Sequence, residues 1–125
     1  MINPDLMYAK THEWLKDLGN GTFEVGISDH AQDELGDLVF VNLPEVGDAL
    51  EMGTALGEAE SVKAVSEVFS PLTATVTAVN EELQDAPERI NSDPFGAWLI
   101  EVGDITGQAE LMDADAYTAW CEQEG

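Results

Sequence analysis

The sequence has few basic residues and no long apolar stretch. Its 125 residues include 4 Lys and Arg against 26 Asp and Glu, a formal net charge of −22. Nucleic acids and anionic membrane surfaces both require clustered Lys and Arg, so neither is an expected partner. The longest apolar runs have four residues, such as Leu38 to Val41, whereas a membrane-spanning helix needs about 20. Both partner classes are therefore excluded.

Cysteine is almost absent as well. The single cysteine, Cys121, cannot form an intrachain disulfide, which is typical of a reducing compartment. Residues 1–10 lack a basic start followed by an apolar stretch, so no secretory signal is expected. Together these features predict a cytoplasmic protein.

The excess of acidic residues has two interpretations that the sequence leaves open. It suits a protein that meets basic partners, because opposite charge speeds encounter and salt screens the effect. It is equally typical of a salt-adapted proteome, where it implies nothing about partners.

Turn signals divide the chain into short elements. Asn20-Gly21 predicts a hairpin over residues 12–27, because both residues tolerate positive φ. Ser28 and Gly36 are suited to begin and end a helix over 29–35. The other expected elements are strands over 38–43 and 97–102, several short strands between 45 and 80, a helical turn over 81–88 and a C-terminal helix from 113 to about 122.

Many short strands with regular turns predict a mainly β fold, either a barrel or a sandwich. At 44% hydrophobic residues, the chain is too apolar to be disordered despite its charge. Its length suits a single domain over residues 1–125. On the C-terminal helix, Tyr117, Trp120 and Cys121 share one face, which favours Cys121 as a small packed residue over a reactive thiol.

Lys63 is the residue best suited to carry chemistry. It is the only lysine after Lys16, and similar strand–turn–strand segments on either side of it would place it at a protruding turn. An ε-amine on a four-carbon stem can hold a cofactor through an amide bond, which removes its charge. An unmodified surface lysine among acidic residues is the alternative interpretation.

Metal and nucleotide motifs are not recognisable in the sequence. Residues 91–102 begin like a calcium loop, but Phe95 and Val102 occupy positions that need oxygen ligands. His12 and His30 are isolated and lack a metal-ligand spacing. No phosphate-binding glycine loop is present, and no metal site is expected.

Six blocks of the sequence resemble, in order, one known family. They are His12-Glu13-Trp14, Gly26 to Gln32, Leu35 to Val41, Leu43 to Gly47, Glu60 to Ala64 with Pro71 after it, and Val79-Asn80. That family is the glycine cleavage system H protein, and the resemblance extends from about Leu6 to Trp120. Biotinyl domains place Met on both sides of their lysine, and acyltransferase lipoyl domains usually have Asp-Lys-Ala. Val62-Lys63-Ala64 fits neither pattern as well.

The resemblance implies a barrel-sandwich hybrid, mainly β with short helices and a C-terminal helix, which acts as a carrier rather than an enzyme. It implies lipoic acid attached to Lys63 by lipoylating enzymes. The lipoyl arm would take an aminomethyl group from glycine decarboxylase (P protein) to aminomethyltransferase (T protein). Dihydrolipoamide dehydrogenase (L protein) would then reoxidise it. A monomer is expected.

Three acidic residues match positions thought to shelter the loaded arm in the family: Glu13, Glu34 and Glu67. Glu13 is the preferred candidate, because it lies in the block His12-Glu13-Trp14; solvated carboxylates are the alternative for each of the three. Ala74 and Glu101 depart from the family, which commonly has glycine and lysine there. Two other functions remain open. One is an H-like protein that relays lipoyl groups to other enzymes, and the other is an acidic structural or ion-binding domain with Lys63 unmodified.

Overall fold

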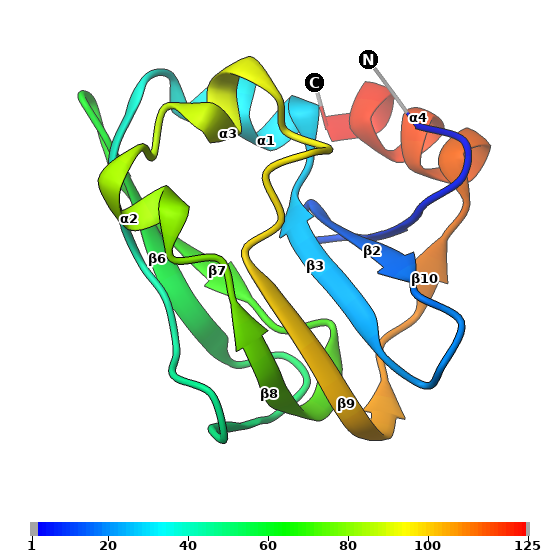
Figure 1. The fold of residues 1–125 in the computed structure, drawn as a ribbon. Helices are drawn as coiled ribbons and strands as arrows, with labels where there is room; N and C mark the ends of the chain where they lie inside the picture. The colour runs from blue at the N-terminus through cyan, green and yellow to red at the C-terminus, as the bar shows by residue number, and fades with distance from the viewer. Residues whose placement is uncertain (1–2, 125) are drawn as a thin grey trace.

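The computed structural model describes residues 3–124, which form two antiparallel sheets and four short helices (Figure 1). The elements, in chain order, are β1 (Met7–Ala9), β2 (Glu13–Asp17), β3 (Phe23–Ile27), α1 (Asp29–Leu35), β4 (Leu38–Asn42), β5 (Ala49–Leu50), β6 (Ala55–Ser61), β7 (Val65–Phe69), β8 (Leu72–Val79), α2 (Glu82–Asp85), α3 (Arg89–Ser92), β9 (Ile100–Gln108), β10 (Leu111–Met112) and α4 (Ala114–Glu124). The mainly β fold with short helices and a C-terminal helix is therefore confirmed. None of the helices described is long and apolar enough to cross a membrane.

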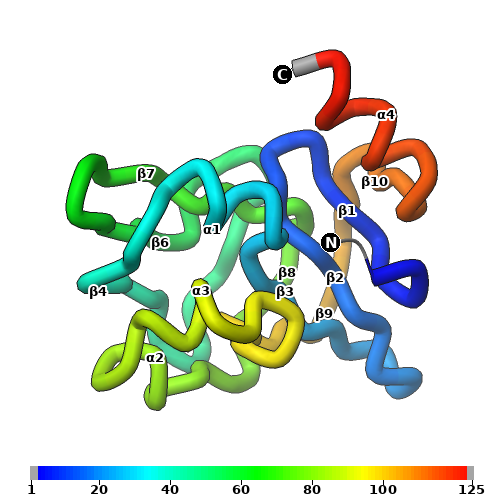
Figure 2. The backbone as a smooth tube through the Cα atoms, turned by 90° about the horizontal axis from the view of Figure 1, so that it is seen from above, coloured from blue at the N-terminus to red at the C-terminus, as the bar shows by residue number. Residues whose placement is uncertain are grey.

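The larger sheet has seven strands in the order β10-β1-β2-β3-β9-β8-β5, and the smaller has the order β4-β6-β7. The apolar side chains of both sheets share one core, to which Val25, Val41, Val68 and Ile100 contribute from four different strands. Figures 1 and 2 both show the β6–β7 turn at the edge of the molecule farthest from α4. The smaller sheet thus places the β6–β7 turn at an edge of the molecule, on the side opposite α4.

Local turn chemistry explains the elements that the sequence predicts correctly. The β2–β3 hairpin closes through Gly19 and Gly21, which have φ of 88° and 81°. The helix over 29–35 begins where Ser28 Oγ accepts a hydrogen bond from the Ala31 N–H at 3.2 Å, and it ends at Gly36, with φ of 84°. These glycines adopt a left-handed conformation that side chains disfavour.

Two elements differ from the expectation. The strand expected over 97–102 begins only at Ile100, because the Ala97 N–H is hydrogen-bonded to Asp93 O in the preceding turn at 2.9 Å. It then continues to Gln108, which pairs with Leu72 of β8. The helical turn over 81–88 is replaced by α2 and α3, which lie on either side of Pro87.

A second, smaller core lies beneath α4. Trp14, Tyr8 and Tyr117 are completely buried there, and the two tyrosine rings stack at 4.4 Å between centroids. The Trp14 indole lies over Gly26, where an added Cβ would come within 2.3 Å of the ring. Trp14 thus acts as a core residue that fixes β2 against β3.

Candidate functional site

Lys63 lies in the turn of residues 62–64 that joins β6 to β7, as the sequence predicts. Lys63 and both its neighbours in the chain are exposed, and Val62 is 70% accessible. The residue before the turn, Ser61, is buried and organises it. Its Oγ accepts hydrogen bonds from the N–H groups of Lys63 (3.3 Å) and Ala64 (3.1 Å). A backbone hydrogen bond of 2.8 Å from Ser61 N to Ala64 O closes the turn.

The turn is also attached to the loop that follows α1. The Val62 N–H donates to Asp37 O at 3.1 Å. The lysine stem runs past Gly36, and a Cβ at that glycine would lie 3.1 Å from Lys63 Cε. The backbone of the turn is therefore held by Ser61 and Asp37, and the outer part of the lysine stem lies against Gly36, while the residue as a whole remains exposed.

Asn91 of α3 holds this loop in place, a role that the sequence did not reveal. Its Nδ2 donates to Gly36 O at 2.8 Å and to Gln32 Oε1 at 2.9 Å, and its Oδ1 accepts from the Leu38 N–H at 2.8 Å. The residue that opens the calcium-like motif is thus a structural bridge between α3, α1 and β4. Asparagine can do this because its amide group both donates and accepts.

Removal of the Ser61 hydroxyl is expected to loosen the lysine turn without unfolding the protein. In Ser61→Ala, two backbone N–H groups lose their acceptor, which should cost about 1 kcal/mol in the free energy of unfolding. Because Lys63 is then less ordered, kcat/KM for any enzymatic modification of its amine should fall severalfold. Ser66→Ala is the matched control, since that hydroxyl makes only a 3.4 Å contact with Glu67 O. Equal modification of both variants would contradict the role of Ser61.

A cleft of about 360 Å³ opens beside the turn. Its walls come from the β1–β2 turn, α1 and the start of β7, and its lining residues are Thr11, His12, Ala31, Glu34, Leu35, Ala64, Val65 and Ser66. Of the three acidic residues that the sequence singled out, Glu34 lines this cleft. Glu67 is exposed on β7 and pairs in register with Glu58 of β6, so another acidic residue faces it across the strands.

The structure places Glu13 behind this cleft rather than in it. Its side chain is 3% exposed, and its Oε1 accepts a hydrogen bond from the Thr11 hydroxyl. Burial raises the pKa of the Glu13 carboxyl from 4.5 to about 8, although hydrogen bonds from Thr11 and the Phe69 backbone oppose the shift. Glu13 is therefore held largely as the neutral acid near pH 7.

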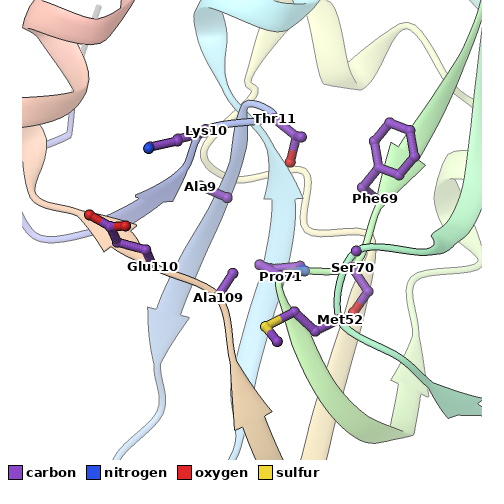
Figure 3. Close-up of a pocket in the computed structure, with 10 residues that line it drawn as sticks. Ala9, Lys10, Thr11, Met52, Phe69, Ser70, Pro71, Ala109 and Glu110 are labelled. Atoms are coloured by element: carbon purple, nitrogen blue, oxygen red, sulfur yellow. The ribbon is translucent and has the colours of Figure 1, made fainter.

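A second, more apolar groove begins on the other side of Thr11. It has a volume of about 410 Å³, and Ala9 and Ala109 face Met52 and Pro71 across it (Figure 3). Because Thr11 lines both cavities, they meet at this residue. Thr11 therefore lies between the cleft and the groove, and its hydroxyl donates a hydrogen bond to the buried Glu13 carboxyl.

The two histidines are not isolated in the structure. Their ring centroids lie 4.8 Å apart, and His12 Nδ1 is 2.7 Å from the Tyr117 hydroxyl. That hydroxyl also contacts Ser28 Oγ at 2.7 Å. The sequence could not show this cluster, because its members come from the β1–β2 turn, the start of α1 and α4.

The two-sheet fold with a lysine on an exposed hairpin turn defines a carrier domain of the lipoyl type. A family model described as "Glycine cleavage H-protein" matches residues 6–124. The chain belongs to the glycine cleavage H-protein family, whose members are lipoyl carriers of the glycine cleavage system and not catalytic enzymes.

Individual relatives agree with this assignment. A glycine cleavage system H protein of Idiomarina loihiensis is 51% identical over 126 residues and covers 98% of each chain. A probable glycine cleavage system H protein of Pyrococcus furiosus is 52% identical over 122 residues, or 95% of this chain and 91% of its own. The crystal structure of a glycine cleavage system H protein from Mycobacterium marinum superposes with a TM-score of 0.88 at 38% identity, covering 99% of each chain. The family resemblance and the fold expected from the sequence are thus confirmed.

Proposed function

We propose that Lys63 carries covalently bound lipoic acid and that the chain shuttles an aminomethyl group between enzymes of the glycine cleavage system. The exposed position of Lys63 on an ordered hairpin turn is the observation that supports this most. An acylating enzyme can reach its amine there, while the Ser61 and Asp37 contacts hold its backbone. The cleft beside the turn offers space into which an arm on this lysine can fold.

When bound, lipoic acid supplies a disulfide that accepts the aminomethyl group and is later restored by oxidation. The chain's own residues do not offer an alternative, since a single cysteine cannot form an internal redox pair. The protein supplies a fixed base for the arm, an exposed amine for its attachment and a cleft that limits access of water to the cargo.

The proposed partners are the P, T and L proteins and the lipoylating enzymes. Four exposed apolar side chains lie on the smaller sheet and its turn: Val39, Phe40, Val62 and Val65. We call this group the lysine face. Apolar residues around an exposed functional lysine suit transient docking, and the net charge of −22 would steer basic surfaces towards the molecule. We place this monomeric shuttle in the cytoplasm, where a single cysteine stays reduced.

Mass spectrometry tests the attachment directly. Protein purified from its native cell is expected to show the intact mass of the lipoylated chain, and peptide mapping should assign the added group to Lys63. Peptides that contain only unmodified Lys63, from cells whose other lipoyl proteins are modified, would contradict the proposal. They would favour the acidic structural domain instead.

Glu34, Glu13 and Glu67 remain the proposed acidic residues that shelter the cargo, and their positions give them different roles. Glu34 lines the cleft and can meet a protonated amine there, whereas Glu13 becomes accessible only if Thr11 moves. Glu67, exposed on β7 beyond the lining residues, can contact only an arm that lies outside the cleft.

Ammonia release from the loaded protein, measured without T protein, separates these roles. Glu34→Gln is expected to speed this release by at most about fivefold, because a charged pair made by a side chain that is 66% exposed contributes about 0–1 kcal/mol. Glu13→Gln should speed it as well if Thr11 yields to the arm. Glu67→Gln should change the rate least of the three, because Glu67 lies outside the residues that line the cleft. Equal rates in all three variants and the unmodified sequence would remove these carboxylates from the site.

A further inference from the structure

A second cluster of reactive side chains lies between the cleft and α4. It consists of His12 on the β1–β2 turn, His30 on α1 and Cys121 on α4, and one ligand atom of each lies within 4.8 Å of the others. All three residues are half-buried. They are also the only histidines and the only cysteine in the whole chain. Figure 1 shows α1 and α4 near each other along the top of the molecule.

The backbone around His12 is held in a conformation that favours this cluster. Its φ is 75°, in the left-handed region that few residues other than Gly adopt, although His, like Asn and Asp, is found there more often than most. Two backbone hydrogen bonds maintain it, from His12 N to Ala9 O and from Ser28 N to His12 O, both 3.0 Å long. Strained residues of this kind concentrate at functional sites, because the surrounding structure must be arranged to hold them.

The His12 ring is oriented by a contact outside the cluster, whereas a ring nitrogen of His30 is left without an aligned partner among the described residues. His12 Nδ1 lies 2.7 Å from the Tyr117 hydroxyl, which packs in the buried core beneath α4. The Nε2 atom of His30 is buried and makes no aligned hydrogen bond, although Glu34 Oε1 is 3.1 Å away. An outer hydrogen bond that fixes the tautomer and the ring direction is the usual companion of a metal-ligating histidine.

We propose that His12, His30 and Cys121 form a binding site for a divalent transition metal ion of the zinc class. Two imidazoles and one thiolate match the ligands that zinc and cobalt prefer, and they exclude magnesium and calcium, which require oxygen. Tetrahedral coordination places such ligand atoms about 3.5 Å apart. A contraction of roughly 1 Å from the observed spacing is within reach of side-chain rotation at three half-buried positions.

The cluster also has a candidate for the fourth ligand position. Glu34 is 66% exposed in its side chain and already lies beside His30 Nε2, so its carboxylate or a water molecule can complete the coordination. Glu34 and His12 both line the cleft next to Lys63. A bound ion would therefore form part of the wall of that cleft and would fix two of its residues.

Cobalt(II) is the appropriate probe, because its absorption spectrum distinguishes thiolate ligands from the many carboxylates of this chain. The full-length chain is used with Lys63→Arg, so that no lipoyl dithiol contributes, and with a reductant that contains no thiol. One equivalent of cobalt is expected to produce a thiolate-to-metal charge-transfer band in the near ultraviolet, together with visible bands of tetrahedral intensity. Zinc should displace it, whereas a large excess of magnesium should not.

Substitutions then assign the ligands. Cys121→Ser should abolish the charge-transfer band, and His12→Gln or His30→Gln should weaken cobalt binding at least tenfold. Glu122→Gln, an exposed acid next to Cys121, is the matched control and should leave the spectrum unchanged. Thermal unfolding of each variant confirms that it is folded. A folded parent without the band, or a band that survives in Cys121→Ser, would overturn the proposal.

Discussion

Replacing Lys63 with arginine is expected to abolish transfer of the aminomethyl group while leaving the fold intact. Arginine keeps the positive charge, but its guanidinium cannot be acylated by the chemistry that modifies lysine. Because the side chain is exposed, the free energy of unfolding should change by less than about 0.5 kcal/mol. The effect on function is therefore separated from any effect on stability.

The measurement is glycine-dependent turnover in a mixture of the P, T and L proteins. Lys63→Arg should reduce it to the rate seen without any carrier, and the variant should gain no mass in cells that lipoylate the parent. Lys16→Arg is the control, since this exposed lysine of β2 lies away from the hairpin turn. Turnover that persists in Lys63→Arg would place the arm elsewhere. Absence of turnover with the lipoylated parent would favour a lipoyl-relay role instead.

The second large effect concerns Glu13 and is an effect of pH on stability. The folded-state pKa of this carboxyl is about 8, above its ordinary value of 4.5, because the group is buried. The folded state thus holds the proton more tightly than the unfolded state does. The contribution of this bound proton to the free energy of unfolding is complete below about pH 4.5. It is lost as the pH rises through about 8.

Denaturant unfolding of the parent and of Glu13→Gln, at about pH 5 and about pH 8, measures this contribution. Each pKa unit corresponds to about 1.4 kcal/mol, so the parent should lose about 3 kcal/mol relative to Glu13→Gln over this range. The glutamine side chain cannot ionise, but it retains an oxygen that can accept the hydrogen bond from the Thr11 hydroxyl. The remaining acidic groups are common to both proteins and cancel in the difference. A difference that is independent of pH would show that Glu13 is not held as the neutral acid.

Local signals made part of the fold predictable. Asn20-Gly21 and the Ser28–Gly36 pair define their hairpin and helix through backbone preferences that do not depend on distant residues. By contrast, β9 continues past Gly103, Asp104 and Gly107, where propensity favours a turn, because pairing with β8 supplies its hydrogen bonds. Its true length depends on tertiary contacts that the local pattern does not contain.

The same distinction applies to the site. Lys63 could be found from its isolation among acidic residues and from the surrounding family pattern. The support from Asn91 and the proximity of His12, His30 and Cys121 could not, since each joins segments that are remote in the chain. The burial of Glu13 beneath Thr11 could not be predicted from the sequence either, because it depends on β7 of the other sheet packing nearby.

The support that Asn91 and Ser61 give to the lysine turn has a consequence for how tightly partners need to bind. With its base immobile, an arm on Lys63 acts as a short tether of fixed origin. A docked enzyme would then experience the cargo at an effective concentration in the millimolar range, set by the length of the tether alone. Docking can be correspondingly weak and brief, which allows one carrier to leave each enzyme quickly and serve the next.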